Sequence, residues 1–377
     1  MSAKKKIIII GPAYPLRGGL ASYDERLAKE FGDQVFDTTI YTFSLQYPGF
    51  LFPGTTQYSS EPAPKNLKIK VIINSVNPFN WIKIGNQLKK IKPDIIVVRF
   101  WLPFMGPCFG TILRRVKKNN HTKIICIADN IIPHEKRIGD EGFTKYFLKP
   151  VDAFITMSEK VLSDLRMLGN HKPAQFVPHP LYDNFGEKIS KQESRKKLGI
   201  DITDNIILFF GFIRKYKGLD ILLDAVKILS TSDQKIKLLI AGEFYEDKNF
   251  YTHLINKLDI KDYLILHTEF IPDSEIKYYF GAADCVVQPY RNATQSGVTP
   301  LSYHFEKPMI VTDVGGLPSL VPDKKAGLIA EPNAADIAEK IQQYFQLGEN
   351  YFLPHLREEK KKYSWNNMVQ AILNLAN

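Results

Sequence analysis

Two cations and two glycines surround the start of a helix in the segment GFIRKYKGLDILLDA, residues 211–225. An apolar run ends near Gly211, Arg214 and Lys217 follow, and a helix is predicted to begin near Leu219. Backbone N–H groups at a helix N-terminus attract anions, and cationic side chains add charge-assisted contacts. The spacing therefore favours a pyrophosphate site over the alternative, an ordinary exposed basic loop.

A second glycine-rich turn lies in GPAYPLRGGLASYDERLAKEF, residues 11–31. Arg17, Gly18 and Gly19 precede a helix with a regular apolar stripe, so backbone amides could approach a phosphate closely. The segment lacks the G-x-G-x-x-G pattern of nicotinamide-binding proteins, which argues against a dehydrogenase. A purely structural glycine turn is the alternative.

A third segment, residues 289–321, places Gln295, Ser296 and Gly297 before a helix predicted over 298–305. Val298 and the residues before it could present amides to an anion, with Ser296 as hydroxyl donor or cap. An N-cap followed by a tight turn is the alternative.

A carboxylate and an imidazole follow a predicted strand in CIADNIIPHEK, residues 126–136. Asp129 and Asn130 stand at the strand end, and His134 lies on the following loop. Such groups can position or deprotonate a hydroxyl, so Asp129 and His134 are candidate catalytic residues. His179, in FVPHPL, is predicted to be structural.

Short β-branched runs alternate with helical patterns along the whole chain, as in doubly wound parallel sheets covered on both faces. Strands are predicted at Lys6–Gly11, Asp37–Phe43, Leu67–Ile73, Asp94–Phe100, Thr122–Ala128, Ala153–Met157, Ile206–Phe212, Lys235–Ala241, Tyr263–His267, Cys285–Gln288, Met309–Thr312 and Gly327–Ala330.

The 377 residues are enough for two such domains. The α/β pattern stops in the polar stretch around residues 172–205 and restarts at Ile206. We therefore expect domains over 1–180 and 181–355, facing a central cleft. Residues 356–377 are expected to form a helix packing back toward the first domain, or else a terminal helix on the second.

Charge and cysteine content limit the classes of partner and compartment. Residues 1–180 carry 26 Lys+Arg and 14 Asp+Glu, whereas residues 181–377 carry 24 and 26. The basic half predicts an anionic partner or, alternatively, a merely solvated surface. Three scattered cysteines and a short apolar start indicate a reducing, cytoplasmic location. The apolar loop Trp101–Phe109 suggests peripheral contact with the inner face of the cell membrane, or interior packing. No basic-aromatic module for nucleic acid is visible.

In their order, these motifs resemble the retaining GT-B glycosyltransferases of family 4 (glycosyl transferases group 1). The resemblance covers nearly the whole chain and is most specific from Gly211 to Glu331, through GFIRKYKG, AGE, ADCVVQPY, SGV and VTDVGGLP. It implies a GT-B fold, which consists of two Rossmann-like domains. The first domain would bind the acceptor, and the second would bind a nucleotide-sugar donor.

The resemblance also implies roles for single residues. Arg214 and Lys217 would bind and stabilise the donor diphosphate, while Gly18 and Gly19 would meet the donor phosphate or sugar. Further donor contacts are expected from Phe270, Ile271, Thr294, Gln295, Ser296, Gly297, Val298 and Ser302. Acceptor contacts are expected from Arg17, Arg99, Trp101, Asp129 and Asn130.

The chain departs from the family pattern at four positions, and one of them is Phe212, which stands where the family often has the arginine. Thr294 and Ser302 stand where the family usually has a Glu-x7-Glu pair, and Asp129 stands where it often has histidine. The expected activity is a hexosyltransferase that retains configuration and needs neither metal nor other cofactor, in cell-surface glycan or polysaccharide biosynthesis. Two alternatives stay open: a nucleotide-sugar 2-epimerase, and a catalytically silent nucleotide-sugar-binding subunit.

Overall fold

A computed structural model describes residues 4–49, 56–132, 139–231, 235–293 and 296–377. The chain divides into two compact units, residues 1–180 with 364–377 and residues 181–363. The second unit therefore extends beyond the expected boundary at residue 355, because helix α13 (Glu349–Lys360) packs on helices α10 and α12 of that unit.

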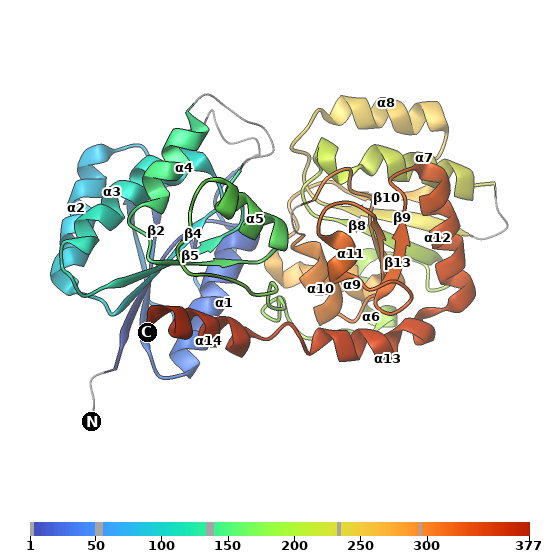
Figure 1. The fold of residues 1–377 in the computed structure, drawn as a ribbon. Coiled ribbons are helices and arrows are strands. Elements are labelled where there is room, and N and C mark those ends of the chain that lie inside the picture. The colour runs from blue at the N-terminus through green and yellow to red at the C-terminus, as the bar shows by residue number, and fades with distance from the viewer. Residues whose placement is uncertain (1–3, 50–55, 133–138, 232–234, 294–295) are drawn as a thin grey trace. The chain divides into compact units, whose positions relative to one another are not determined.

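A parallel seven-stranded sheet forms the centre of the first unit, in the order β3-β2-β1-β4-β5-β6-β7 (Figure 1). Its strands are β1 (Lys6–Ile10), β2 (Asp37–Leu45), β3 (Ile69–Asn74), β4 (Ile95–Phe100), β5 (Lys123–Ala128), β6 (Ala153–Thr156) and β7 (Ala174–Phe176). The sequence predicted no strand at β7 and placed its residues in the interdomain linker, because the strand is only three residues long and prolines stand on both sides of it.

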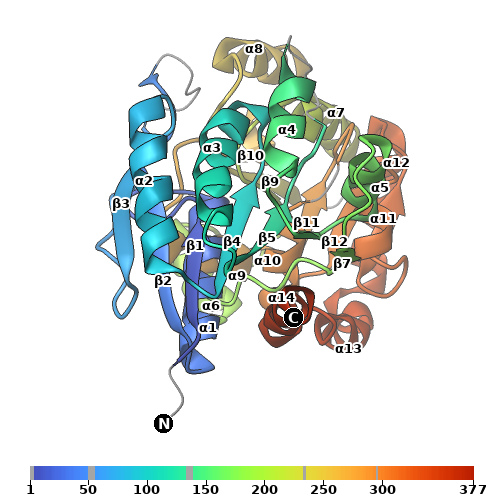
Figure 2. The same ribbon diagram turned by 60° about the vertical axis from the view of Figure 1, so that its left-hand side comes forward.

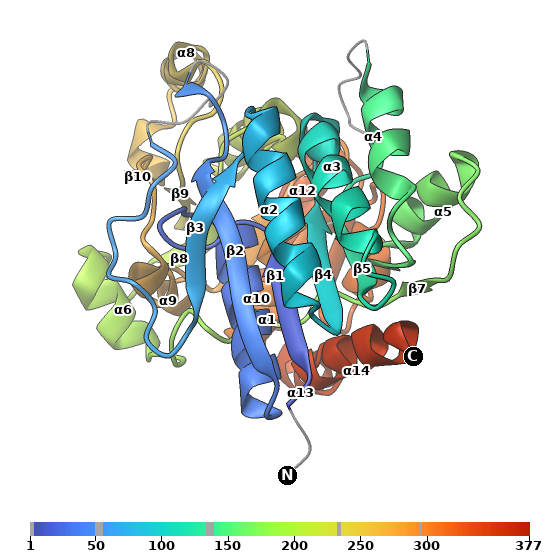
Figure 3. The ribbon, with the colours of Figure 1, turned by 90° about the vertical axis from the view of Figure 1, so that its left-hand side faces the viewer.

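Helices cover both faces of this sheet. Figure 3 shows α2 and α3 in front of the strands, with α1 behind them. The helices of the unit are α1 (Gly19–Asp33), α2 (Pro78–Ile91), α3 (Gly106–Lys117), α4 (Asp140–Leu148), α5 (Glu159–Met167) and α14 (Trp365–Ala376). The last of these contacts α1, β5 and β6, so the C-terminal segment completes the first unit.

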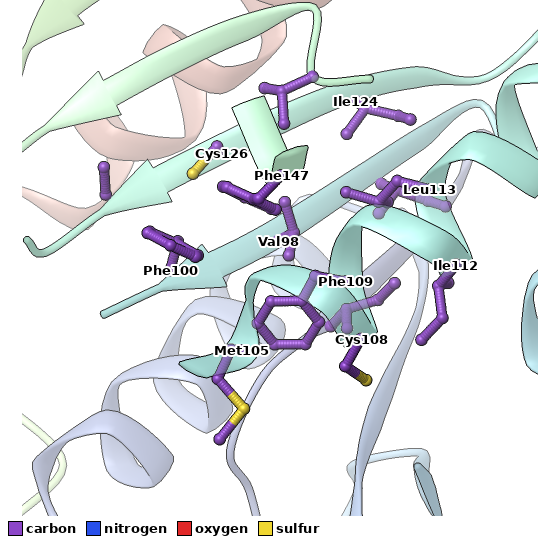
Figure 4. Packing of buried hydrophobic residues seen from close by; sticks show 14 of the residues in the cluster. Val98, Phe100, Met105, Cys108, Phe109, Ile112, Leu113, Ile124, Cys126 and Phe147 are labelled. Carbon is purple, nitrogen blue, oxygen red and sulfur yellow. The ribbon is translucent and has the colours of Figure 1, made fainter. Parts of the chain in front are cut away.

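The apolar segment Trp101–Phe109 packs largely inside the first unit. Met105, Cys108 and Phe109 are fully buried in one core cluster with residues of β4, β5 and α4 (Figure 4). Phe100 stacks on Phe147 with ring centroids 4.2 Å apart. Interior packing therefore explains the apolar composition of this segment, and its predicted membrane contact is not supported by exposure.

The second unit repeats the design with a parallel six-stranded sheet in the order β10-β9-β8-β11-β12-β13. Its strands are β8 (Asn205–Phe210), β9 (Ile236–Ala241), β10 (Leu264–His267), β11 (Cys285–Gln288), β12 (Met309–Thr312) and β13 (Gly327–Ala330). Its helices, with α13, are α6 (Lys191–Leu198), α7 (Leu219–Leu229), α8 (Lys248–Leu258), α9 (Ile276–Ala282), α10 (Val298–His304), α11 (Leu317–Leu320) and α12 (Ala334–Leu347).

Each unit is thus a Rossmann-like domain, which confirms the α/β fold predicted for the two halves. Among the described residues, no helix has both the length and the apolar character needed to span a bilayer. The three cysteines are free and buried.

Candidate functional site

The predicted diphosphate motif lies at the carboxyl end of β8, the middle of the second sheet. After Gly211 the chain runs through a short 3-10 turn, Lys215–Lys217, and enters α7 at Leu219. Gly211 and Gly218 have left-handed φ angles of 93° and 65°. At Gly218 an added Cβ would lie 2.0 Å from the carbonyl oxygen of Pro289, so only glycine lets the turn approach that strand end.

Lys217 is a buried cation without an acidic partner. Its side chain belongs to a residue only 9% exposed, and no described carboxylate forms an ion pair with it. The Nζ atom lies 5.7 Å from the ring centroid of Tyr290. The pKa of Lys217 is lowered to about 7, mainly because the side chain is buried and to a smaller extent because the charge of Arg214 is nearby. A buried lysine amine in these surroundings attracts anions strongly once it is protonated.

The start of α10 lies close to this lysine. A Cβ built on Gly211 would be 3.0 Å from Lys217 Nζ and 3.9 Å from the Val298 side chain. Two motifs that are about 80 residues apart in the sequence are therefore brought together by the order of the strands.

Ser296 and Gly297 precede α10 as predicted, and Ser296 is buried. The backbone N–H of Val298 donates to Ser296 Oγ at 3.2 Å, and Tyr290 Oη lies 3.3 Å from the same oxygen. Ser302 is fully buried, and its hydroxyl donates to the Val298 carbonyl oxygen at 2.9 Å. Thr294 and Gln295 lie outside the described residues.

An aromatic cluster stands beside the basic turn. Phe212 stacks on Tyr245 with centroids 4.2 Å apart, and its ring lies 6.5 Å from that of Phe270. The guanidinium of Arg214 lies over Tyr245 at 5.1 Å. These rings follow β8, β9 and β10, so they line the carboxyl edge of the sheet. Phe270 is half-buried and its neighbour Ile271 is buried.

The glycine turn of the first unit follows β1 and leads into α1. Gly18, with φ of 103°, caps the helix, and Gly19 is its first residue. Arg17 Nε donates to the carbonyl oxygen of Thr56 at 2.7 Å, while Leu16 forms a β-bridge with Tyr58. Residues 56–59 therefore hold the turn in place beside the sheet.

Arg99 and Asp129 form a buried pair rather than an exposed binding surface. Arg99 is 2% exposed, and its Nε and Nη2 atoms each donate to Asp129 at 2.6 Å. This bidentate geometry orients the start of the loop that follows β5. Asn130 is partly exposed, and His134 lies outside the described residues. Trp101 donates from Nε1 to Tyr47 Oη at 2.6 Å and is partly exposed.

Sequence reasoning missed the side chains that surround Arg99. Its guanidinium lies 3.8 Å from the centroid of Tyr23, and Asp24 Oδ1 lies 3.6 Å from Nη1. Burial raises the pKa of Asp24 well above its usual value, and burial lowers that of His179 to about 3. The spacing of Leu20, Asp24, Leu27 and Phe31 on one helical face was a signal for the inward carboxyl.

Within the described ranges, no cluster of three or more His, Cys, Asp or Glu side chains could hold a metal ion. At the second unit's sheet edge, Arg214, Lys217 and the backbone amides that precede α10 are groups that can bind a phosphorylated ligand.

Comparison with known proteins places this geometry in context. Residues 190–363 match the family model described as "Glycosyl transferases group 1". Along 97% of its length the chain is 26% identical to an uncharacterized glycosyltransferase of Methanocaldococcus jannaschii, 96% of which is covered. It is 23% identical to a putative teichuronic acid biosynthesis glycosyltransferase of Bacillus subtilis, over 68% of this chain and 62% of that one.

Solved structures share the fold at lower identity. HepE of Anabaena in complex with UDP-glucose superposes with a TM-score of 0.73 and 15% identity, covering 98% of each chain. Together these matches support a glycosyltransferase enzyme with the GT-B fold.

Proposed function

We propose that this glycosyltransferase moves a sugar from a nucleotide-diphosphate-sugar donor to an acceptor hydroxyl, with the donor held by the second unit. The observation that carries the proposal is Lys217, a buried ammonium without an acidic partner among the described residues. Burying an unpaired cation is costly, so its retention at a strand end favours an anionic ligand there.

The proposed chemistry breaks the bond between the anomeric carbon and the diphosphate oxygen. Negative charge then develops on the leaving diphosphate, where Arg214, Lys217 and the amides of 296–298 stabilise it. The acceptor oxygen bonds to the anomeric carbon, and its proton passes to the leaving phosphate. Attack on the same face of the sugar retains configuration.

The aromatic cluster Phe212–Tyr245–Phe270 is proposed to hold the nucleobase. Any nucleobase can stack on aromatic rings, so the cluster is compatible with a nucleotide but does not identify its base. Ile271 would add an apolar contact beside Phe270. Because Ser302 is buried and bonded within α10, its part in donor binding would be to hold the helix rather than to touch the sugar.

The first unit is proposed to hold the acceptor, a glycan in cell-surface polysaccharide biosynthesis. Arg17 and the partly exposed Trp101 and Asn130 follow the carboxyl ends of its strands. The teichuronic acid relative from Bacillus subtilis supports this acceptor class. The free cysteines agree with a reducing cytoplasm.

A thermal-shift screen against UDP-, GDP-, ADP- and dTDP-sugars tests the donor assignment. A ligand present at about 100 times its dissociation constant stabilises by about 2.7 kcal/mol, so a true donor will raise the melting temperature of the second unit clearly. If no nucleotide sugar shifts the wild-type protein, the proposed function is wrong.

Raising the pH above about 7 is expected to weaken nucleotide-sugar binding by up to about tenfold per pH unit. Lys217 has a pKa near 7 in the free protein, so above that pH a proton must be taken up before the charged form can bind. Isothermal titration from about pH 6 to 9 measures the slope.

Lys217→Arg is the control for this pH dependence, because a guanidinium keeps its charge over the whole range. Its binding curve is expected to be flat. Equal slopes for the two proteins would contradict the role given to Lys217.

A further inference from the structure

Basic residues are concentrated without acidic neighbours in one stretch of the first unit. From residue 62 to 93 the chain has seven lysines and no Asp or Glu; residues 95–128 add six more cations and again no acid. Only Asp94 interrupts the stretch, and it accepts a hydrogen bond from the backbone N–H of Lys6. Three of these lysines lie on α2 and three of these cations on α3, and neither helix contains Asp or Glu, so both helices carry net positive charge.

Helix α2 presents the aromatic side chain of Phe79 and several lysines on its outer face. Ile84 and Leu88 are buried against the sheet, whereas Phe79, Lys83 and Lys90, spaced i, i+4 and i+11, are exposed together. Phe79 is 84% exposed, the highest value among the exposed large hydrophobic side chains. A single exposed hydrophobic side chain is common on a protein surface, so Phe79 carries weight only together with the lysines of the same helix face and the exposed Val76 shortly before it in the chain.

Helix α3 extends this surface because it packs closely beside α2. A Cβ on Gly85 would lie 2.7 Å from Arg115 Cβ and 2.9 Å from the Ile112 carbonyl oxygen, so glycine permits the approach. Figures 2 and 3 show the two helices side by side over the same face of the sheet. We call Phe79, Lys83, Lys89, Lys90, Arg115 and Lys118 the α2–α3 face; none of its cations forms an ion pair with a described carboxylate.

We propose that the α2–α3 face docks on an anionic lipid bilayer, with Phe79 entering the headgroup boundary and the cations meeting lipid phosphates. A basic helical face with a protruding aromatic ring fits membrane-surface binding, where apolar burial and charge attraction add. Single-stranded nucleic acid would use the same cations and could stack on Phe79, but it gains nothing from the aliphatic side chain of Val76, which is 43% exposed, so the bilayer is the favoured partner.

The proposal is independent of the donor site, because the α2–α3 face lies in the first unit and Lys217 in the second. It also assigns part of the basic excess of the first half to a defined surface. The segment Trp101–Phe109, which the sequence suggested for this contact, lies largely in the core.

Vesicle flotation tests the proposal with phosphatidylcholine vesicles and with vesicles that contain about 30% phosphatidylglycerol. The wild-type protein is expected to float only with the anionic vesicles and to be released by about 0.5 M NaCl. A Phe79→Ser/Lys83→Gln/Lys90→Gln variant should bind about 250-fold more weakly, since each lysine contributes roughly fivefold and the ring about tenfold.

Helix α8 of the second unit provides a matched control. Phe250 is 54% exposed there, with Lys248 and Lys257 also exposed, so Phe250→Ser/Lys248→Gln/Lys257→Gln removes the same groups from another surface. This control is expected to float like the wild type. Unchanged tryptophan fluorescence and an unchanged donor thermal shift show that the α2 variant remains folded.

Three results would overturn the proposal: no flotation of the wild type with anionic vesicles at low salt, undiminished flotation of the α2 variant, or equal loss in the α8 control. Preferential binding of single-stranded RNA, with vesicles unable to compete, would assign the face to nucleic acid instead. None of these results bears on donor binding, which the thermal-shift screen measures separately.

Discussion

Replacing Lys217 by methionine is expected to lower kcat/KM for the nucleotide-sugar donor by about 10²- to 10³-fold, the usual effect of removing one preorganised group that stabilises transition-state charge. Methionine keeps most of the side-chain volume but removes the buried ammonium. Steady-state rates with the donor identified by the thermal-shift screen measure the change.

Lys215→Met is the matched control, because Lys215 belongs to the same 3-10 turn but is exposed. Its kcat/KM is expected to stay within about threefold of the wild type, as surface substitutions usually do little. The unliganded Lys217→Met protein should be no less stable than the wild type, since it loses a buried charge without an acidic partner. Full activity of Lys217→Met, or low activity caused by unfolding, would contradict the assignment.

Asp129→Ala is expected to destabilise the first unit by about 3 to 5 kcal/mol, because Arg99 is left as a buried guanidinium without its bidentate partner. Tryptophan fluorescence during urea unfolding measures this directly. Trp81, Trp101 and Trp365 all belong to the first unit, so the signal reports on that unit alone.

Asp24→Asn tests the same cluster with a smaller change. Asp24 approaches Arg99 only to 3.6 Å, and burial raises the pKa of its carboxyl, so asparagine should be tolerated far better than the loss of Asp129. Equal destabilisation by the two substitutions would mean that Asp24 stabilises Arg99 as much as Asp129 does.

The alternation of short apolar runs with helical patterns predicted the fold, because the composition that favours each strand lies within a few consecutive residues. Runs such as Ile7–Ile10 and Ile95–Val98 can be stable only between two layers of helices, so their composition alone predicts a covered parallel sheet. The exception, Ala174–Phe176, contains one aromatic residue and lies among prolines; it becomes a strand only because β6 offers it a free edge.

The motifs around Arg214, Lys217 and Ser296 were also readable, since glycines, cations and helix starts have local signatures. The sequence did not show which side chains are exposed. Arg99 was predicted to contact the acceptor, but the neighbouring strand ends place Asp129 against it, and their pairing removes both from solvent. Burial and pairing depend on which strands become neighbours. Only the tertiary structure could therefore separate Lys217, with which no described carboxylate forms an ion pair, from Arg99, which is paired with Asp129.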